Sequence, residues 1–286
     1  FAVAAVPSAF FLVALFFVPE SPRWLIERDR EGEAIDVLIR VNPPEEADRE
    51  AASIREAVAQ ESGTIGELLQ PGLRHAFYLG LALAVLQQWV GINTLYFYGS
   101  EILKQHASQS NTAAIGLNVW LGVMNFAMTI GSLVVIDRLG RRPLLIGSAA
   151  CLGLGLFALA GTFQMPNPPL ALVLACMLFC AGSFAIGLGP VVWVMLAEIY
   201  PNRIRGLAMG LATAALWVGC TSLTFTFPSI AAAFGPSKTF CIYAVMNFIM
   251  VAVVWFFAPE TKGRTLEEIE EFWKHGAAKG SRLEEI

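Results

Sequence analysis

Charge is scarce in this sequence and absent from long stretches of it. Only 15% of the 286 residues are Asp, Glu, Lys or Arg, against about 25% in a typical soluble domain. A helix needs about 20 apolar residues to cross the hydrocarbon core of a bilayer. Five uncharged runs reach that length: 75–100, 111–136, 143–197, 206–237 and 239–259. The pattern excludes a soluble enzyme, a nucleic-acid-binding protein and a disordered chain, and it predicts an all-α polytopic membrane protein.

The chain also has few groups that a membrane enzyme or a metal site would need. Its three histidines, His75, His106 and His275, lie at the edge of a span, in a loop and in the C-terminal tail. Cys176 and Cys180 sit one helical turn apart, but no His or acid is near them in sequence, so they do not form a metal site. We therefore expect no cofactor, no metal and no enzymatic activity. Since the spans contain no carboxylate, proton coupling would need one upstream.

Seven membrane spans are expected: 1–18, 75–100, 111–136, 143–161, 170–197, 206–233 and 239–258. The chain begins at Phe1 inside an apolar run, so we expect a further membrane segment before it. The segment 19–73 differs in kind, because it holds 13 of the 23 acidic residues. Two amphipathic patterns in it, separated by Asn42-Pro43-Pro44, predict a small helical unit outside the membrane.

Basic residues are concentrated on one side of the membrane. With seven spans, the segments 19–74, 137–142, 198–205 and 259–286 share a side and carry 17 of the 19 Lys and Arg residues. The positive-inside rule makes this side cytoplasmic. We therefore expect a multi-pass protein of the cell membrane with a cytoplasmic C-terminus.

Uncharged hydrogen-bonding side chains interrupt the apolar spans. The second span holds Gln87, Gln88, Asn93 and Tyr98, and the glycines that flank them indicate a locally unwound helix. The three amides cannot all share one helix face, so they must face partner helices or a cavity. Residue types alone leave two interpretations open. One is interhelical hydrogen bonds, worth about 0.6 kcal/mol each, and the other is a site for a neutral ligand rich in hydroxyls.

Three later spans add Asn125, Trp193 and Trp217. A Trp ring beside amides can cover the C–H face of a sugar ring. These residues extend the second interpretation beyond the second span.

Acidic and basic residues also gather at the ends of spans on the basic side. They are Glu20, Arg23, Asp137, Arg141, Arg142, Glu198, Arg205 and Glu260. Exposed pairs are worth about 0–1 kcal/mol, but a partly dehydrated network formed in only one conformation would tilt a two-state equilibrium. The alternative is that these charges serve only solubility and topology.

Several motifs together resemble the sugar porters, a family in the major facilitator superfamily. In order they are Pro19-Glu20-Ser21-Pro22-Arg23-Trp24-Leu25, Gln87-Gln88-x-x-Gly91-Ile92-Asn93, Asp137-Arg138-x-Gly140-Arg141-Arg142, Gly189-Pro190-x-x-Trp193, Glu198-x-x-Pro201-x-x-x-Arg205 and Pro259-Glu260-Thr261-Lys262-Gly263. The resemblance implies that the spans are helices six to twelve of a twelve-helix transporter, with the first five absent. It assigns 1–18 to the last helix of the N-terminal half, 19–73 to a cytoplasmic helical linker domain, 74–258 to the six-helix C-terminal half and 259–286 to a cytoplasmic tail.

The resemblance also implies roles for individual residues. The positions that match the family's sugar contacts are Gln87, Gln88, Asn93, Tyr98, Asn125, Trp193 and Trp217. Just before Trp217, where many members carry an amide, this sequence has Leu216. The eight charged residues match a network that forms in the outward-facing state and separates on inward opening, so they are expected to be gate residues.

The expected function is transport of a monosaccharide by alternating access, as facilitated diffusion or as proton symport. The expected partners are the monosaccharide, the lipid bilayer, the missing N-terminal half and, in a symporter, protons; no nucleic acid is expected. The alternatives are a transporter of inositol or of another polyol or organic solute, and a sugar receptor of the same fold that does not transport. The short tail, 259–286, speaks against the receptor. A seven-helix receptor would not explain the charged block 19–73.

Overall fold

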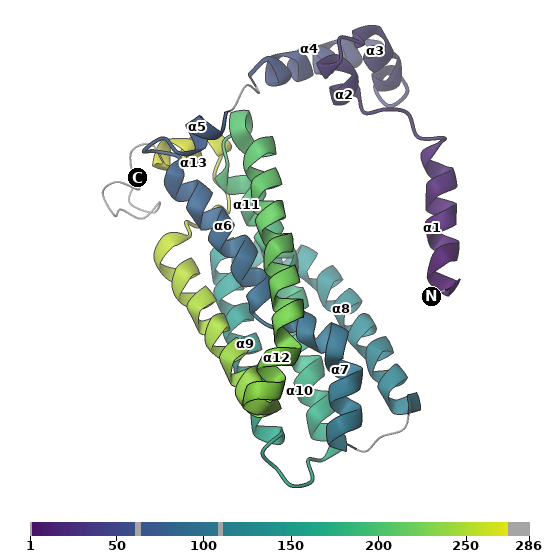
Figure 1. Cartoon of the computed structure of the whole chain (residues 1–286). Coiled ribbons are helices and arrows are strands. Elements are labelled where there is room, and N and C mark those ends of the chain that lie inside the picture. Colours follow the sequence, from purple (N-terminus) through teal and green to yellow (C-terminus); the bar gives the residue numbers. More distant parts are fainter. Residues whose placement is uncertain (1, 61–63, 108–110, 274–286) are drawn as a thin grey trace. The chain divides into compact units, whose positions relative to one another are not determined.

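The computed structural model describes residues 2–60, 64–107 and 111–273, and within these ranges the regular structure is helical throughout (Figure 1). The chain divides into two compact units, Phe1–Gly63 and Thr64–Ile286. Each unit is described by itself.

The first unit contains one apolar helix and three short polar ones. Their bounds are α1 Ala2–Leu15, α2 Pro22–Glu27, α3 Glu31–Ile39 and α4 Pro44–Gln60. Large side chains of α1 are exposed, with Phe10 at 77%, as expected of a helix surrounded by lipid. Helices α2 to α4 bury a small cluster that includes Leu25, Ala34, Leu38 and Ala51, so both expected amphipathic patterns form helices.

The second unit contains the remaining helices. They are α5 Ile65–Leu68, α6 Arg74–Trp89, α7 Ile92–Ala107, α8 Asn111–Leu139, α9 Arg141–Thr162, α10 Leu170–Ser183, the π-helical segment η1 Phe184–Leu188, α11 Gly189–Ile199, α12 Asn202–Phe257 and α13 Leu266–Glu271.

Five helical stretches in the described part of this unit are long and apolar enough to cross a membrane: Arg74–Gly99, Val119–Leu139, Arg141–Thr162, Leu170–Ile199 and Asn202–Phe257. The last is 56 residues long and bends sharply at Gly235, where φ is 78°. It therefore contains two of the expected spans, 206–233 and 239–258. The structure confirms the all-α class. Each expected span between residues 75 and 258 overlaps one of these stretches, whereas the expected span 1–18 contains only the shorter apolar helix α1.

Close backbone approach holds the bundle together. Helix α12 packs along both α9 and α6, and α9 also contacts α10 and η1. At Gly187 of η1, a Cβ atom would lie only 2.3 Å from the Ser148 hydroxyl of α9. Small residues at helix contacts allow this approach, which supplies dispersion contacts where lipid gives little hydrophobic driving force.

Candidate functional site

The span that carries most of the amides is broken in the middle, as expected. Helix α6 ends at Trp89 and α7 begins at Ile92, with Gly91 between them at φ 87°. A Cβ atom on Gly91 would also lie 2.6 Å from Cβ of Tyr243. Both the left-handed backbone and the close ring require glycine at this position.

Three amides at the break form a directional relay of hydrogen bonds. Asn93 Nδ2 donates to Gln88 Oε1 at 2.5 Å, and Gln88 Nε2 donates to Gln87 Oε1 at 3.2 Å. Gln87 and Gln88 are buried, at 3% and 8% exposure. We call this arrangement the amide relay. It agrees with the expectation that the three side chains face partner helices or a cavity.

The amide relay ends on a second irregular segment of backbone. Gln87 Nε2 donates to the carbonyl oxygens of Leu188 and Gly189, at 2.9 and 3.2 Å. These carbonyls lie where η1 passes into α11, next to Pro190, which has no N–H. The relay therefore joins the break between α6 and α7 to the junction of η1 and α11.

Two other candidate sugar residues, Asn125 and Tyr98, have partners outside the amide relay. Asn125 Nδ2 donates to the Tyr96 hydroxyl at 2.9 Å, and the Tyr98 hydroxyl donates to the Thr224 carbonyl at 3.2 Å. The Tyr98 ring also lies 4.6 Å, centroid to centroid, from the Phe227 ring. In this unit their hydrogen bonds link α8 to α7 and α7 to α12.

Both candidate tryptophans present part of their rings at the surface of the unit. Trp193 on α11 is 39% exposed and Trp217 on α12 is 63% exposed. An exposed ring is free to cover a ligand.

Asn247, which was not predicted from the sequence, supports the break from the last span. It is fully buried, and its Nδ2 donates to the carbonyls of Val90 and Tyr243, each at 2.9 Å. The Val90 carbonyl closes α6, so Asn247 satisfies an acceptor that the break would otherwise leave unpaired. A signal was present, since Asn247 is the only carboxamide in 239–258.

Four of the expected gate residues come together at one end of the second unit. The Arg141 guanidinium donates to both carboxylate oxygens of Glu198, with its shortest contact at 2.8 Å. It also reaches Asp137 at 3.3 Å. Arg141 is 15% and Glu198 24% exposed, so this pair is more strongly coupled than an exposed one.

Glu260 caps a helix rather than pairing with a guanidinium. Its carboxylate accepts from the backbone N–H groups of Arg141 and Arg142, both at 3.0 Å. These are the first two residues of α9, where the helix dipole favours a negative charge. The cap joins the C-terminal segment to the same cluster, and Thr261 reinforces it by donating to Glu198.

The remaining gate candidates have other surroundings. The Arg142 guanidinium donates to the Trp255 carbonyl at 2.6 Å, and Arg205 donates to the Tyr200 carbonyl at 3.3 Å. Glu20 and Arg23 belong to the first unit. Among the described residues, no group of three or more His, Cys, Asp or Glu side chains is arranged to hold a metal.

Known proteins are similar to this chain in sequence and in fold. The family described as "Sugar (and other) transporter" matches residues 1–273. The D-xylose-proton symporter of Escherichia coli (strain K12) is 35% identical over 280 residues, covering 96% of this chain and 56% of the relative. The major myo-inositol transporter IolT of Bacillus subtilis (strain 168) is 36% identical over 299 residues, covering 99% and 62%.

A solved structure of a transporter is similar to this chain in fold as well. The proton:xylose symporter XylE, a major facilitator superfamily protein bound to 6-bromo-6-deoxy-D-glucose, matches with a TM-score of 0.77 at 35% identity. The match covers 95% of this chain and 58% of that one, so the chain spans less than two thirds of the length of these relatives. This chain is a multi-pass membrane protein with the major facilitator superfamily fold, and it belongs to the sugar (and other) transporter family.

Proposed function

We propose that this chain supplies the sugar-binding half of a transporter that moves a monosaccharide across the cell membrane by alternating access. The observation that carries the proposal is the amide relay, which places three uncharged amides between two breaks in the membrane-spanning backbone. A facilitator without chemistry on its substrate needs hydrogen-bonding groups of this kind at mid-membrane depth.

The amides have hydrogen-bonding capacity left for a ligand. A carboxamide offers two N–H donors and an acceptor oxygen with two lone pairs. Gln87 Nε2 already bonds to two carbonyls, but Gln88 uses one of its two donors and one of its two lone pairs within the relay. A sugar hydroxyl is both donor and acceptor, so adjacent hydroxyls can replace amide–amide bonds one for one. Such an exchange desolvates the sugar without leaving an amide unpaired.

The aromatic and outer polar residues complete the proposed site. Trp193 and Trp217 cover apolar faces of the sugar ring. Tyr98 and Asn125, which bond to neighbouring helices in this structure, contribute hydroxyl and amide contacts.

The charged residues at the span ends are the proposed gate, on the side proposed to be cytoplasmic together with the C-terminal tail. They are Glu20, Arg23, Asp137, Arg141, Arg142, Glu198, Arg205 and Glu260. The bidentate pair of Arg141 with Glu198 supports this role, because partly buried charge pairs make one conformation distinct from another.

The proposed domains follow the same scheme. The segments are 1–18 as the last helix of the N-terminal half, 19–73 as the cytoplasmic linker domain, 74–258 as the C-terminal half and 259–286 as the tail. The partner required for transport is the N-terminal half, and protons are the coupling ion in a symporter.

Names of relatives favour two substrate classes. One relative is named for D-xylose and protons, and another for myo-inositol. A monosaccharide is the main proposal. A cyclic polyol is the alternative, since the same amides match hydroxyls on either ring.

The test is uptake and binding by the full-length protein in proteoliposomes, with labelled pentoses, hexoses and myo-inositol. Gln88→Ala removes the centre of the amide relay, and we expect a loss of about 1–3 kcal/mol, or about 5–150-fold in affinity. Gln164→Ala is the matched control, because the Gln164 side chain is exposed and, among the described residues, its hydrogen bond is to Ser237.

Each outcome separates the alternatives. Loss of affinity in Gln88→Ala with normal binding by Gln164→Ala supports the site, and collapse of uptake on adding a proton uncoupler identifies symport. Unchanged affinity in Gln88→Ala would remove the amide relay from the binding site. Binding of all solutes without uptake would mark a receptor.

A further inference from the structure

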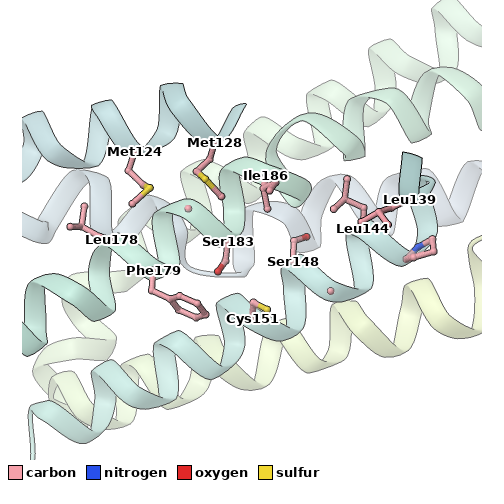
Figure 2. A pocket seen from close by; sticks show the side chains of 13 residues that line it. Met124, Met128, Leu139, Leu144, Ser148, Cys151, Leu178, Phe179, Ser183 and Ile186 are labelled. Carbon is pink, nitrogen blue, oxygen red and sulfur yellow. The ribbon is translucent and has the colours of Figure 1, made fainter. Parts of the chain in front are cut away.

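An apolar cavity of about 370 Å³ lies between α8, α9 and the α10–η1 segment (Figure 2). Met124 and Met128 of α8 line one wall, Gly147 and Cys151 of α9 a second, and Phe179 of α10 a third. None of the candidate sugar residues and none of the gate residues lines it. The cavity, which we call the α8–α9 groove, is therefore separate from the proposed transport site.

The α8–α9 groove opens on the surface of the membrane-spanning bundle. Cys151 is exposed, Phe179 is 51% exposed and Leu139 is 59% exposed. Its lining is apolar apart from two serines, and Ser148 satisfies its own hydroxyl by donating to the Leu145 carbonyl at 3.2 Å. Water gains no hydrogen bonds in such a space, so its natural occupant is apolar.

The shape of the α8–α9 groove favours a chain over a compact ring. Its lining on α8 extends from Met124 to Leu139, which is about 22 Å along a helix axis at 1.5 Å per residue. Two methionines on this wall adjust their side chains to irregular ligands. At Gly147, a Cβ atom would meet no other atom within 4 Å, so the wall has spare room there.

A positive charge stands at the end of the α8–α9 groove that lies on the basic side. Arg138 immediately precedes Leu139, and its side chain is exposed. In the part of the chain that the structure describes, its guanidinium has no hydrogen-bonding partner, whereas Arg141 bonds to Glu198 and Arg142 to the Trp255 carbonyl. An uncommitted guanidinium at the edge of the membrane suits a phosphate oxygen.

We propose that the α8–α9 groove binds a phospholipid from the leaflet on the basic side. One acyl chain lies along Met124 and Met128, and the phosphate meets Arg138. The occupant is a lipid because the groove opens at membrane depth, is dry and apolar along its length, and has its cation at the end where a headgroup lies.

The test uses the full-length protein in vesicles of phosphatidylglycerol and phosphatidylethanolamine that carry a diazirine on one acyl chain. After irradiation, labelled peptides are located by mass spectrometry. We expect label on the α9 peptide around Cys151. Gly147→Leu fills the groove, and evicting two methylenes should reduce that labelling about fifteen-fold, since each buried CH₂ contributes about fourfold in binding.

Matched variants separate the groove from general effects on α9. Gly161→Leu makes the same change on the same helix, again with nothing within 4 Å of the new Cβ, and should label like the wild type. Cys151→Trp fills the groove from another position and should act like Gly147→Leu. Arg138→Gln should weaken labelling by phospholipid but leave labelling by a diazirine fatty alcohol, which has no phosphate, unchanged.

Three results would overturn the proposal. Equal labelling of Gly147→Leu and wild type would mean that the lipid lies elsewhere. Absence of label in the wild type would mean that another part of the protein covers the groove, and Cys151-to-Cys151 cross-linked dimers would mean that a second copy covers it. None of these readouts depends on sugar uptake, so they leave the proposed function untouched.

Discussion

Removing the carboxamide of Asn247 should weaken the break at Gly91 without touching the proposed sugar contacts. Asn247→Leu keeps the size of the side chain and deletes both donors. The Val90 carbonyl, which accepts from Asn247 at 2.9 Å, then loses this partner in a fully buried environment. Val90 caps the end of α6 and α7 begins at Ile92, so this bond holds the turn that leads to Asn93 in the first turn of α7.

Two opposing effects set the magnitude. A buried acceptor left without its partner costs about 1–3 kcal/mol, although interhelical bonds in membranes average only about 0.6 kcal/mol. Asn247 Oδ1 is itself buried without a hydrogen-bond partner, so its removal recovers part of the cost. We expect a net destabilisation of about 1 kcal/mol. If it affects the sugar-bound conformation, sugar affinity falls about fivefold.

The assay compares Asn247→Leu with Thr239→Val in the full-length protein. Both changes remove a buried polar group from α12, but Thr239 bonds only to the Gly235 carbonyl of its own helix. Sugar affinity should fall in Asn247→Leu alone, and hydrogen exchange should accelerate at the amides of 90–94. Equal behaviour of the two variants in both measurements would refute the reasoning.

Three further changes have expected outcomes. Gly91→Ala places a Cβ at φ 87° and 2.6 Å from Tyr243; the left-handed conformation alone costs about 1–2 kcal/mol, so thermal unfolding should show a clear drop in stability. Glu260→Gln removes the charge from the cap of α9 and should lower the free energy of unfolding by about 1 kcal/mol. The affinity ratio between wild type and Gln88→Ala should be equal at about pH 5.5 and about pH 8, because amides do not titrate; calorimetry at both values measures it.

Each of these predictions has a control and a contrary result. For Gly91→Ala the control is Gly122→Ala, where a Cβ meets nothing within 4 Å, and equal melting temperatures would exclude strain at Gly91. For Glu260→Gln the control is Glu271→Gln on the exposed side of α13; a similar loss there would indicate a general charge effect. For Gln88→Ala, an affinity ratio of wild type to variant that changes with pH would mean that a titrating group lies within the site.

The break in the second span was predictable because two signals coincide there. Glycine next to amides inside an apolar run indicates backbone that cannot remain helical and polar groups that need partners. The π-helical segment 184–188 was not predictable, because its sequence, Phe-Ala-Ile-Gly-Leu, is as apolar as the α-helix around it. A change from i+4 to i+5 hydrogen bonding leaves no mark on hydropathy.

The charged cluster shows a similar limit. The sequence identifies which acids and bases end the spans, and Arg141 with Glu198 forms the kind of pair that it predicts. Nothing in it indicates that Glu260, more than a hundred residues after α9 begins, accepts from backbone N–H groups. That contact depends on tertiary packing, which brings a distant carboxylate to a helix N-terminus.

Helix α11 connects the proposed sugar site to the proposed gate mechanically. The carbonyl of its first residue, Gly189, accepts a hydrogen bond from Gln87. Near its other end, the Glu198 carboxylate accepts from Arg141. The two positions are about 14 Å apart along a helix, and a helix of this length moves as a rod. A hydroxyl that takes over the Gln87 donors would free the start of α11, beside the π-helical segment. A displacement of α11 would then reach the bidentate ion pair at its far end, where a small shift would break a geometry that depends on two parallel bonds.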